Sequence, residues 1–200
     1  MSVDGPGDND RAADDAALAL VDYFATSGLT VAFAESLTAG LAAATVARVP
    51  GASQVLRGGV VVYATDTKHS VLGVNEDVLK TVGPVSKECA IEMARNVREL
   101  YGSDWGVSLT GVAGPDEQDG HPVGEVWVGL ADPDGWTIAL RAYPPRNHRW
   151  ALLPGQSTPV PIVAGDRNTI RLAAVEFALV TLEQTVRQLD EPDLVEEQWV

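Results

Sequence analysis

The chain has 200 residues, 46% of them apolar, which is enough to build one globular domain with a sizeable core. Its formal net charge is −14, and this argues against general attraction to nucleic acid or to an anionic membrane, because both depend on clustered Lys and Arg. The single cysteine, Cys89, permits no internal disulfide and no multi-cysteine metal site; we expect it in the core.

The location of the protein is also indicated by composition. No run of eighteen or more uncharged apolar residues occurs, and the N-terminus lacks the basic start and apolar centre of a signal peptide. We therefore expect a soluble, cytoplasmic protein. Lysine occurs only at Lys68, Lys80 and Lys87, whereas acidic residues are abundant, and this balance suggests a halophilic protein from a high-salt cytoplasm. An acidic protein of a mesophile is the alternative.

The predicted elements alternate between helices and strands along one domain, 12–188. An aperiodic tail is expected at 1–11 and an acidic tail at 189–200. Helices are expected at 14–28, 37–49, 67–74, 75–83, 86–102 and 166–189, strands at 29–34, 55–64 and 104–111, and a hairpin at 124–143. This order predicts an α/β fold, with a mixed sheet covered by helices on both faces.

The segment 144–164, between the hairpin and the last helix, is rich in proline and has no period. Loops of this length without regular structure are often functional. We expect an insertion that is held extended by its prolines and serves as a lid or as an arm that reaches a neighbouring subunit.

Ser36 lies between a predicted strand and a predicted helix, and two readings of it are open. A serine at a helix start commonly caps free backbone N–H groups. The same position also places a hydroxyl beside N–H donors that can hold an oxyanion, as a nucleophile needs.

A serine nucleophile requires a base, and Lys68 is the best candidate. The three histidines give little support for a Ser-His-Asp triad, whereas a buried lysine loses its charge and can accept the serine proton. Lys68 follows the strand that carries Tyr63 and is expected to start a helical turn, where a lysine opposes the helix dipole. The alternative is a solvated loop lysine.

Two further segments are candidates for anion binding. The small residues of Thr110–Gly114 directly follow a strand and let backbone amides approach an anion, although a plain tight turn explains them equally well. Arg167 begins the last predicted helix, where a cation is misplaced unless an anion or an acid faces it; Asp166 and Glu176 are the acids nearby.

Taken together, these patterns resemble the CinA C-terminal domain family, the nicotinamide mononucleotide deamidases, in its stand-alone form. The resemblance covers most of residues 14–185, in the family's order. The stretches that carry it are AESLTAGLAAATVARVPGAS, GGVVVYATDTKHSVLGV, VGPVSKECAIEMARNVRE, LTGVAGP, PVGEVWVGLA and GDRNTIRLAAVEFAL.

The resemblance implies an α/β/α sandwich that hydrolyses the carboxamide of nicotinamide mononucleotide to nicotinate mononucleotide and ammonia, without a metal or a cofactor. It places the nucleophile at Ser36 and the base at Lys68. The positions that it implies for proton transfer or substrate binding are Tyr63, Ser53, Thr110 and Arg167. The helix-start segment of Thr38, Ala39 and Gly40 is expected to supply amides to the oxyanion. The amides of Gly111, Ala113 and Gly114 are candidates for the phosphate. The family usually has Cys and Gly where this chain has Leu37 and Ala39, so we expect a narrower pocket.

Two alternative functions and the oligomeric state also follow from the sequence. A chain with this fold could instead be a non-catalytic nucleotide-binding or regulatory module, since fold alone does not imply activity. DNA binding, which the family's link to competence suggests, is opposed by the charge. The apolar hairpin, Trp150 and the proline-rich loop offer more apolar surface than a monomer exposes comfortably, so we expect a homodimer or a larger homo-oligomer.

Overall fold

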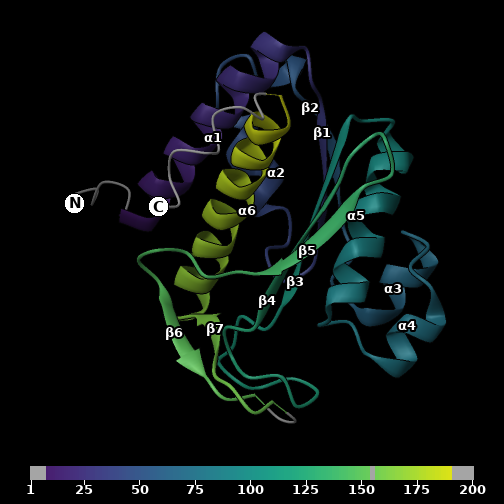
Figure 1. Cartoon of the computed structure of the whole chain (residues 1–200), viewed down its shortest axis with the longest axis vertical. Coiled ribbons are helices and arrows are strands. Elements are labelled where there is room, and N and C mark those ends of the chain that lie inside the picture. The colour runs from purple at the N-terminus through teal and green to yellow at the C-terminus, as the bar shows by residue number, and fades with distance from the viewer. Residues whose placement is uncertain (1–7, 154–155, 191–200) are drawn as a thin grey trace, which may run out of the picture.

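A five-stranded mixed sheet forms the centre of the computed structural model, which describes residues 8–153 and 156–190 (Figure 1). The strands lie in the order β2-β1-β3-β4-β5, with β2, β1 and β3 parallel and β4 and β5 antiparallel. Their bounds are β1 Val31–Glu35, β2 Leu56–Val61, β3 Trp105–Gly111, β4 Val126–Ala131 and β5 Thr137–Arg141. This arrangement confirms the α/β fold.

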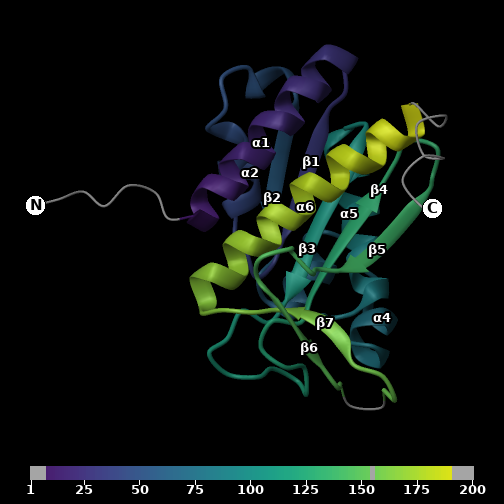
Figure 2. The same ribbon diagram turned by 60° about the vertical axis from the view of Figure 1, so that its left-hand side comes forward.

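Helices cover both faces of the sheet. One face carries α1 Asp8–Ser27, α2 Leu41–Ala47 and α6 Arg167–Asp190, and the other carries α3 Thr65–Ser70, α4 Glu76–Thr81 and α5 Lys87–Tyr101 (Figure 1). The first and the last helix, α1 and α6, lie side by side (Figure 2). The molecule is therefore a three-layer sandwich.

Each face of the sheet has its own apolar core, because neighbouring residues of a strand point to opposite faces. On β1, Phe33 packs with the larger cluster under α1 and α6, which includes Phe24 and Ile170. Ala32 and Ala34 point the other way, into the cluster under α5. Cys89 is buried in this second core and makes no disulfide, as expected.

Helix α5 approaches the sheet closely because glycine faces it on two strands. A Cβ atom at Gly106 would lie 2.1 Å from the carbonyl oxygen of Ala94, and one at Gly129 would lie 2.3 Å from that of Ala90. Ser86 caps this helix by accepting from the amide of Cys89 at 3.2 Å, as the sequence predicts.

Most element boundaries differ by a few residues from the expectations, and three of these differences matter for the site or the domain limits. Residues 8–11, expected in a tail, form the first turn of α1, where Asp8 and Asp10 complement the positive end of the helix. Residues 37–40 are not helical, since Ala39 and Gly40 have φ values of 53° and 93°, so α2 begins only at Leu41. At the other end, α6 continues to Asp190. The tails expected at 1–7 and 191–200 lie outside the described residues.

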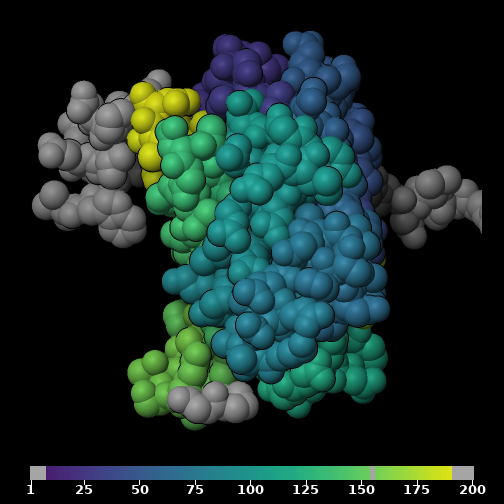
Figure 3. Space-filling view, turned by 90° about the vertical axis from the view of Figure 1, so that its right-hand side faces the viewer, coloured from purple at the N-terminus to yellow at the C-terminus, as the bar shows by residue number. Residues whose placement is uncertain are grey.

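The proline-rich segment 144–164 is not a structureless loop. It contains an antiparallel ribbon of β6 His148–Ala151 and β7 Val160–Val163, which forms a projection at the lower end of the molecule (Figure 3). The ribbon is joined to the domain where the amide of Val163 donates to the carbonyl oxygen of Gly124 at 2.8 Å. Across the described residues, no helix has the length and apolarity that a membrane span needs.

Candidate active site

A pocket opens where the parallel strands β1 and β3 end. The connections that leave these strands diverge to opposite sides here, which is the usual place for a ligand site in an open α/β sheet. The cavity volume is about 80 Å³. The residues that the sequence predicts for the site and that line this pocket are Ser36, Tyr63, Lys68, Thr110, Gly111, Ala113, Gly114 and Arg167.

Ser36 and Lys68 meet in this pocket, although 32 residues separate them. Lys68 Nζ lies 2.9 Å from Ser36 Oγ and also donates to the carbonyl oxygen of Val62 at 2.9 Å. The exposed fractions of Ser36 and Lys68 are 7% and 2%. The lysine is therefore a buried partner of the serine and not a solvated loop residue.

Burial disfavours the charged form of Lys68. Loss of hydration lowers the pKa of its ammonium group from the ordinary value. None of its hydrogen bonds within the described residues goes to a carboxylate, and burial raises the pKa of the neighbouring Cys89 thiol to about 12, so this thiol is not an anionic partner. A neutral amine of this kind can accept a proton from Ser36.

The helix position of Lys68 differs from the expectation. Lys68 lies in the last turn of α3 and does not start the helix, so it does not oppose the helix dipole. The signal that made Lys68 a candidate from helix position was therefore wrong, whereas the resemblance placed it correctly beside Ser36.

Ser36 does not cap helix α2. The N-cap residue is Gly40, and the carboxylate of Glu35 accepts from the amides of Gly40, Ala42 and Ala43 at 2.9 to 3.0 Å. Glu35 is buried, and the start of the helix supplies the donors that its charge requires. The capping interpretation of Ser36 is wrong, and its hydroxyl is left to Lys68.

Three residues expected to bind substrate do not line the pocket: Thr38, Ala39 and Gly40. The amides of Ala39 and Gly40 are already bonded, to the carbonyl oxygen of Ser36 and to Glu35. In the part of the chain that the structure describes, the amides of Leu37 and Thr38 have no protein acceptor. Of the two residues only Leu37 lines the pocket, so the amide of Leu37, directly after the nucleophile, is the donor that remains for an oxyanion.

Arg171 fixes the turn after Ser36, and sequence reasoning missed it. Its Nε donates to the carbonyl oxygen of Leu37 at 3.1 Å and its Nη2 to that of Thr38 at 2.7 Å. Arg171 lies one helical turn after Arg167 on α6, so the same side of that helix provides both arginines. The i, i+4 spacing from Arg167 was the sequence pattern that could have indicated Arg171 as a site residue.

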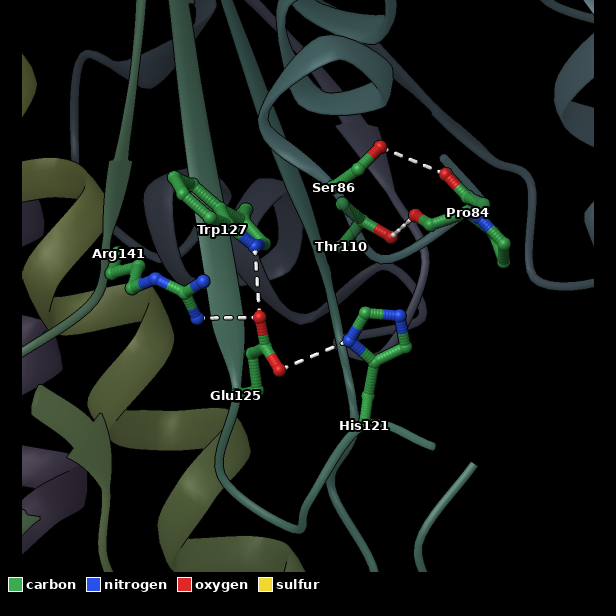
Figure 4. A network of polar contacts seen from close by, with 8 residues as sticks. Pro84, Ser86, Thr110, His121, Glu125, Trp127 and Arg141 are labelled. Carbon is green, nitrogen blue, oxygen red and sulfur yellow. Dashed lines mark hydrogen bonds and ion pairs between the residues drawn. The ribbon is translucent and has the colours of Figure 1, made fainter. Parts of the chain in front are cut away.

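The segment Thr110–Gly114 forms a second part of the pocket wall. Thr110 Oγ1 donates to the carbonyl oxygen of Pro84 at 2.7 Å (Figure 4), which leaves the hydroxyl oxygen free to accept. A Cβ at Gly111 would lie 2.4 Å from the carbonyl oxygen of Glu125, so only glycine fits there. In the described chain the amides of Ala113 and Gly114 donate to no protein acceptor.

Arg167 joins this wall to Tyr63. Its Nη1 donates to the carbonyl oxygen of Gly114 at 2.5 Å and its Nη2 to the Tyr63 hydroxyl at 2.7 Å. The expected acidic partners are not used: Asp166 instead accepts from the amide of Thr169 at the start of α6. Tyr63 is 53% exposed and stands at the mouth of the pocket.

Ser53 is not brought to the site. It lies in the short 3-10 helix Ala52–Gln54, is exposed, and does not line the pocket. The pocket gains other residues that sequence reasoning did not single out, among them Leu37, Thr65, Asp116 and Gln118.

A buried carboxylate supports the loop that follows Gly114. Glu125 accepts from Arg141 Nη1 at 2.5 Å and from Trp127 Nε1 at 3.3 Å, and its other oxygen lies 3.0 Å from His121 Nδ1 (Figure 4). The loop is thereby tied to β4 and β5.

With this geometry in view, comparison with known proteins identifies the family. A family model described as the CinA C-terminal domain matches residues 13–152. The chain belongs to the CinA C-terminal domain family. The match includes Ser36, Lys68 and Thr110, and it ends before α6, which carries Arg167 and Arg171.

Relatives of this CinA domain carry the name competence-damage inducible protein. One from Shouchella clausii is 40% identical over 166 residues, which cover 81% of this chain and 34% of the relative. One from Listeria monocytogenes is 53% identical over 103 residues, which cover 52% of this chain and 25% of the relative. The CinA domain thus spans about a quarter to a third of these relatives.

Solved CinA-type structures match the domain along nearly their whole length. The competence/damage inducible protein CihA from Agrobacterium tumefaciens is 30% identical with a TM-score of 0.73, over 91% of this chain and 97% of that one. A CinA superfamily protein from Escherichia coli is 25% identical with a TM-score of 0.74, over 92% and 99%.

Proposed function

We propose that the chain is a serine amidohydrolase that converts nicotinamide mononucleotide to nicotinate mononucleotide and ammonia, a reaction of pyridine nucleotide salvage. The observation that carries the proposal is the 2.9 Å contact between Ser36 Oγ and the buried amine of Lys68. A hydroxyl beside an amine of lowered pKa is the arrangement that a serine nucleophile requires.

In the proposed reaction, Lys68 takes the Ser36 proton while Ser36 Oγ bonds to the carboxamide carbon. The oxyanion that forms is held by the free amide of Leu37, which lines the pocket directly after the nucleophile. Lys68 then returns the proton to the leaving nitrogen, so that ammonia departs and an ester remains on Ser36. Water attacks this ester, Lys68 accepts its proton and passes it to Ser36 Oγ, and the acid is released.

Because the protein has a net charge of −14, the nucleotide phosphate needs a local group of cationic or N–H donors to bind. Arg167 and the free amides of Ala113 and Gly114, which line the same pocket as Ser36, provide it. Such amides and a planar guanidinium are common phosphate ligands. Tyr63 lines the same pocket and accepts from Arg167, and it is proposed to assist proton transfer in the reaction.

The test is ammonia release from nicotinamide mononucleotide by the purified chain, in both low and high salt. We expect turnover by the native chain, none by Ser36→Ala or Lys68→Met, and native turnover by Lys87→Met, since Lys87 is an exposed lysine that does not line the pocket. The second candidate is a nucleotide-binding module without catalysis, favoured by the non-family residue Leu37 in the pocket. Binding of the nucleotide without ammonia release would select that candidate.

A further inference from the structure

The pocket contains a carboxylate that the proposed reaction does not use. Asp116 lines the same cavity as Ser36 and Lys68. Within residues 8–153 and 156–190 its carboxylate has no hydrogen-bond donor and no cation as partner. Asp116 is exposed at the edge of the pocket, and a carboxylate without a partner is available to a ligand that enters there.

The other charged groups of the pocket are engaged. Lys68 is buried and bonded to Ser36, and burial lowers its pKa, while Arg167 donates to Gly114 and Tyr63. Arg167 is the permanently charged cation of the lining, and Asp116 is its one carboxylate. A ligand that complements both must carry a negative and a positive charge.

Asp116 is held in place by the loop that carries it. At the start of the loop Arg167 binds the carbonyl oxygen of Gly114, and at its end the amide of Gly124 donates to the carbonyl oxygen of Val112 at 2.8 Å. Between them, Gln118 and His121 exchange two backbone hydrogen bonds of 3.1 and 2.8 Å. Both sides of Asp116 are thus anchored.

We propose that Asp116 selects substrates whose amide-bearing ring is positively charged. This inference rests on the function proposed above and specifies its substrate class: amides of a quaternary pyridinium that also carry a phosphate. The quaternary ring nitrogen supplies the positive charge, and Asp116 attracts it when the carboxamide lies at Ser36. An uncharged ring of the same shape gains nothing from Asp116.

The experiment compares nicotinamide mononucleotide with its reduced form, in which the dihydropyridine ring is uncharged while the phosphate, ribose and carboxamide are kept. Values of kcat/KM are measured for both compounds with the native chain, with Asp116→Asn and with Glu117→Gln. Glu117 is the matched control, because it is the next acid in the same loop and does not line the pocket. The ratio of the two kcat/KM values is compared between variants, because the difference in intrinsic reactivity of the two amides is the same in every variant and cancels.

We expect Asp116→Asn to reduce the preference for the charged ring by about three- to fivefold, the size of a partly exposed charge pair, and Glu117→Gln to leave it unchanged. The native preference should decrease with added salt, whereas that of Asp116→Asn should not. An equal loss with both compounds, which would indicate that Asp116 activates water, or no loss at all, overturns the inference.

A binding measurement keeps the inference testable if no turnover occurs. Dissociation constants of both compounds are measured by calorimetry in the Ser36→Ala background, with and without Asp116→Asn. A change of about three- to fivefold in the ratio of the two dissociation constants is expected for the pair of Asp116 and the charged ring. This change supports the inference even when the native chain releases no ammonia. Equal ratios, or no binding of either compound, contradict it.

Discussion

Lys68 combines two properties that rarely occur in one lysine: it is almost fully buried, and no carboxylate among the described residues compensates its charge. Folding therefore lowers its pKa, and the unfolded chain binds more protons than the folded one at pH values between the two. Stability should rise with pH through this window, up to the ordinary lysine value of about 10.4. The proton is lost on folding because hydration of the charge is lost.

The first prediction concerns pH. We expect kcat/KM to rise with pH with a midpoint below about 10, because only the neutral amine of Lys68 accepts the Ser36 proton. Denaturation of Lys68→Met should lack the rise of stability with pH that the native chain shows. Native and Lys68→Met stabilities with identical pH dependence would mean that Lys68 is charged in the fold.

Arg171 tests whether the turn after the nucleophile must be held rigid. Arg171→Gln removes the two bonds to the carbonyl oxygens of Leu37 and Thr38, and we expect kcat to fall about 10- to 100-fold with KM nearly unchanged. Arg171→Lys should restore part of the rate. The control is Arg57→Gln, an exposed arginine on β2. A fall in melting temperature without a change in kcat would make Arg171 purely structural.

Arg167 tests the phosphate site. Arg167→Ala should raise KM by about 10- to 100-fold, as expected for a lost charged hydrogen bond, while a fast acylating reagent still labels Ser36 at the native rate. Arg167→Lys should recover only part of the affinity, because an ammonium group lacks the planar pair of donors. An unchanged KM in Arg167→Ala would show that Arg167 does not bind the phosphate.

At the scale of elements, the distance between α5 and the sheet depends on two glycines. Gly106→Ala forces a methyl group to within 2.1 Å of the Ala94 carbonyl oxygen, which is backbone and cannot move aside. We expect a loss of about 1–3 kcal/mol and a melting temperature lower by about 3–10 °C. Gly59→Ala is the control, since its methyl group would lie 3.2 Å from the Ala43 side chain and 3.4 Å from the Phe33 carbonyl oxygen, much farther than the 2.1 Å at Gly106. Equal effects of the two changes would show that α5 can shift outward.

Elements with local signals could be predicted from the sequence. The helical period of 86–102 and its cap Ser86 predict α5 closely, and the turn residues at 132–135 predict the hairpin of β4 and β5. The turn 36–40 could not be predicted, because it runs directly into the alanine-rich start of α2 and the deciding contacts are those of Glu35 with the helix start. The ribbon was missed because its two strands pair across intervening prolines.

The candidate site was predictable only in part. Ser36, Lys68 and Thr110 follow from family-like motifs that lie in local sequence. The pairing of Arg167 with Tyr63, and of Arg171 with the nucleophile turn, joins segments more than 100 residues apart, and no local pattern reports such contacts. Ser53 shows the opposite error, a motif position that the fold of this chain keeps outside the pocket.

At the scale of the whole molecule, self-association remains a prediction. Trp150 and Leu152 on the projecting ribbon are each 64% exposed, and Tyr143 before it is 52% exposed. Apolar side chains gathered in one segment are typical of interfaces, so light scattering at micromolar concentration should give a dimer or a larger mass. Trp150→Ser with Leu152→Ser should shift the mass toward the monomer, and Leu18→Ser on α1 should not. A monomer mass for the native chain would rule out this assembly.

The contact between the first and the last helix also has a consequence for synthesis. Helix α1 leaves the ribosome early, yet its buried face packs on α6, which ends at Asp190. Ser36 and Lys68 emerge long before Arg167 and Arg171, which complete the pocket from α6. A nascent chain therefore carries the serine and its base on an unfinished scaffold, and this reactive pair acquires a shaped pocket only when the last helix docks.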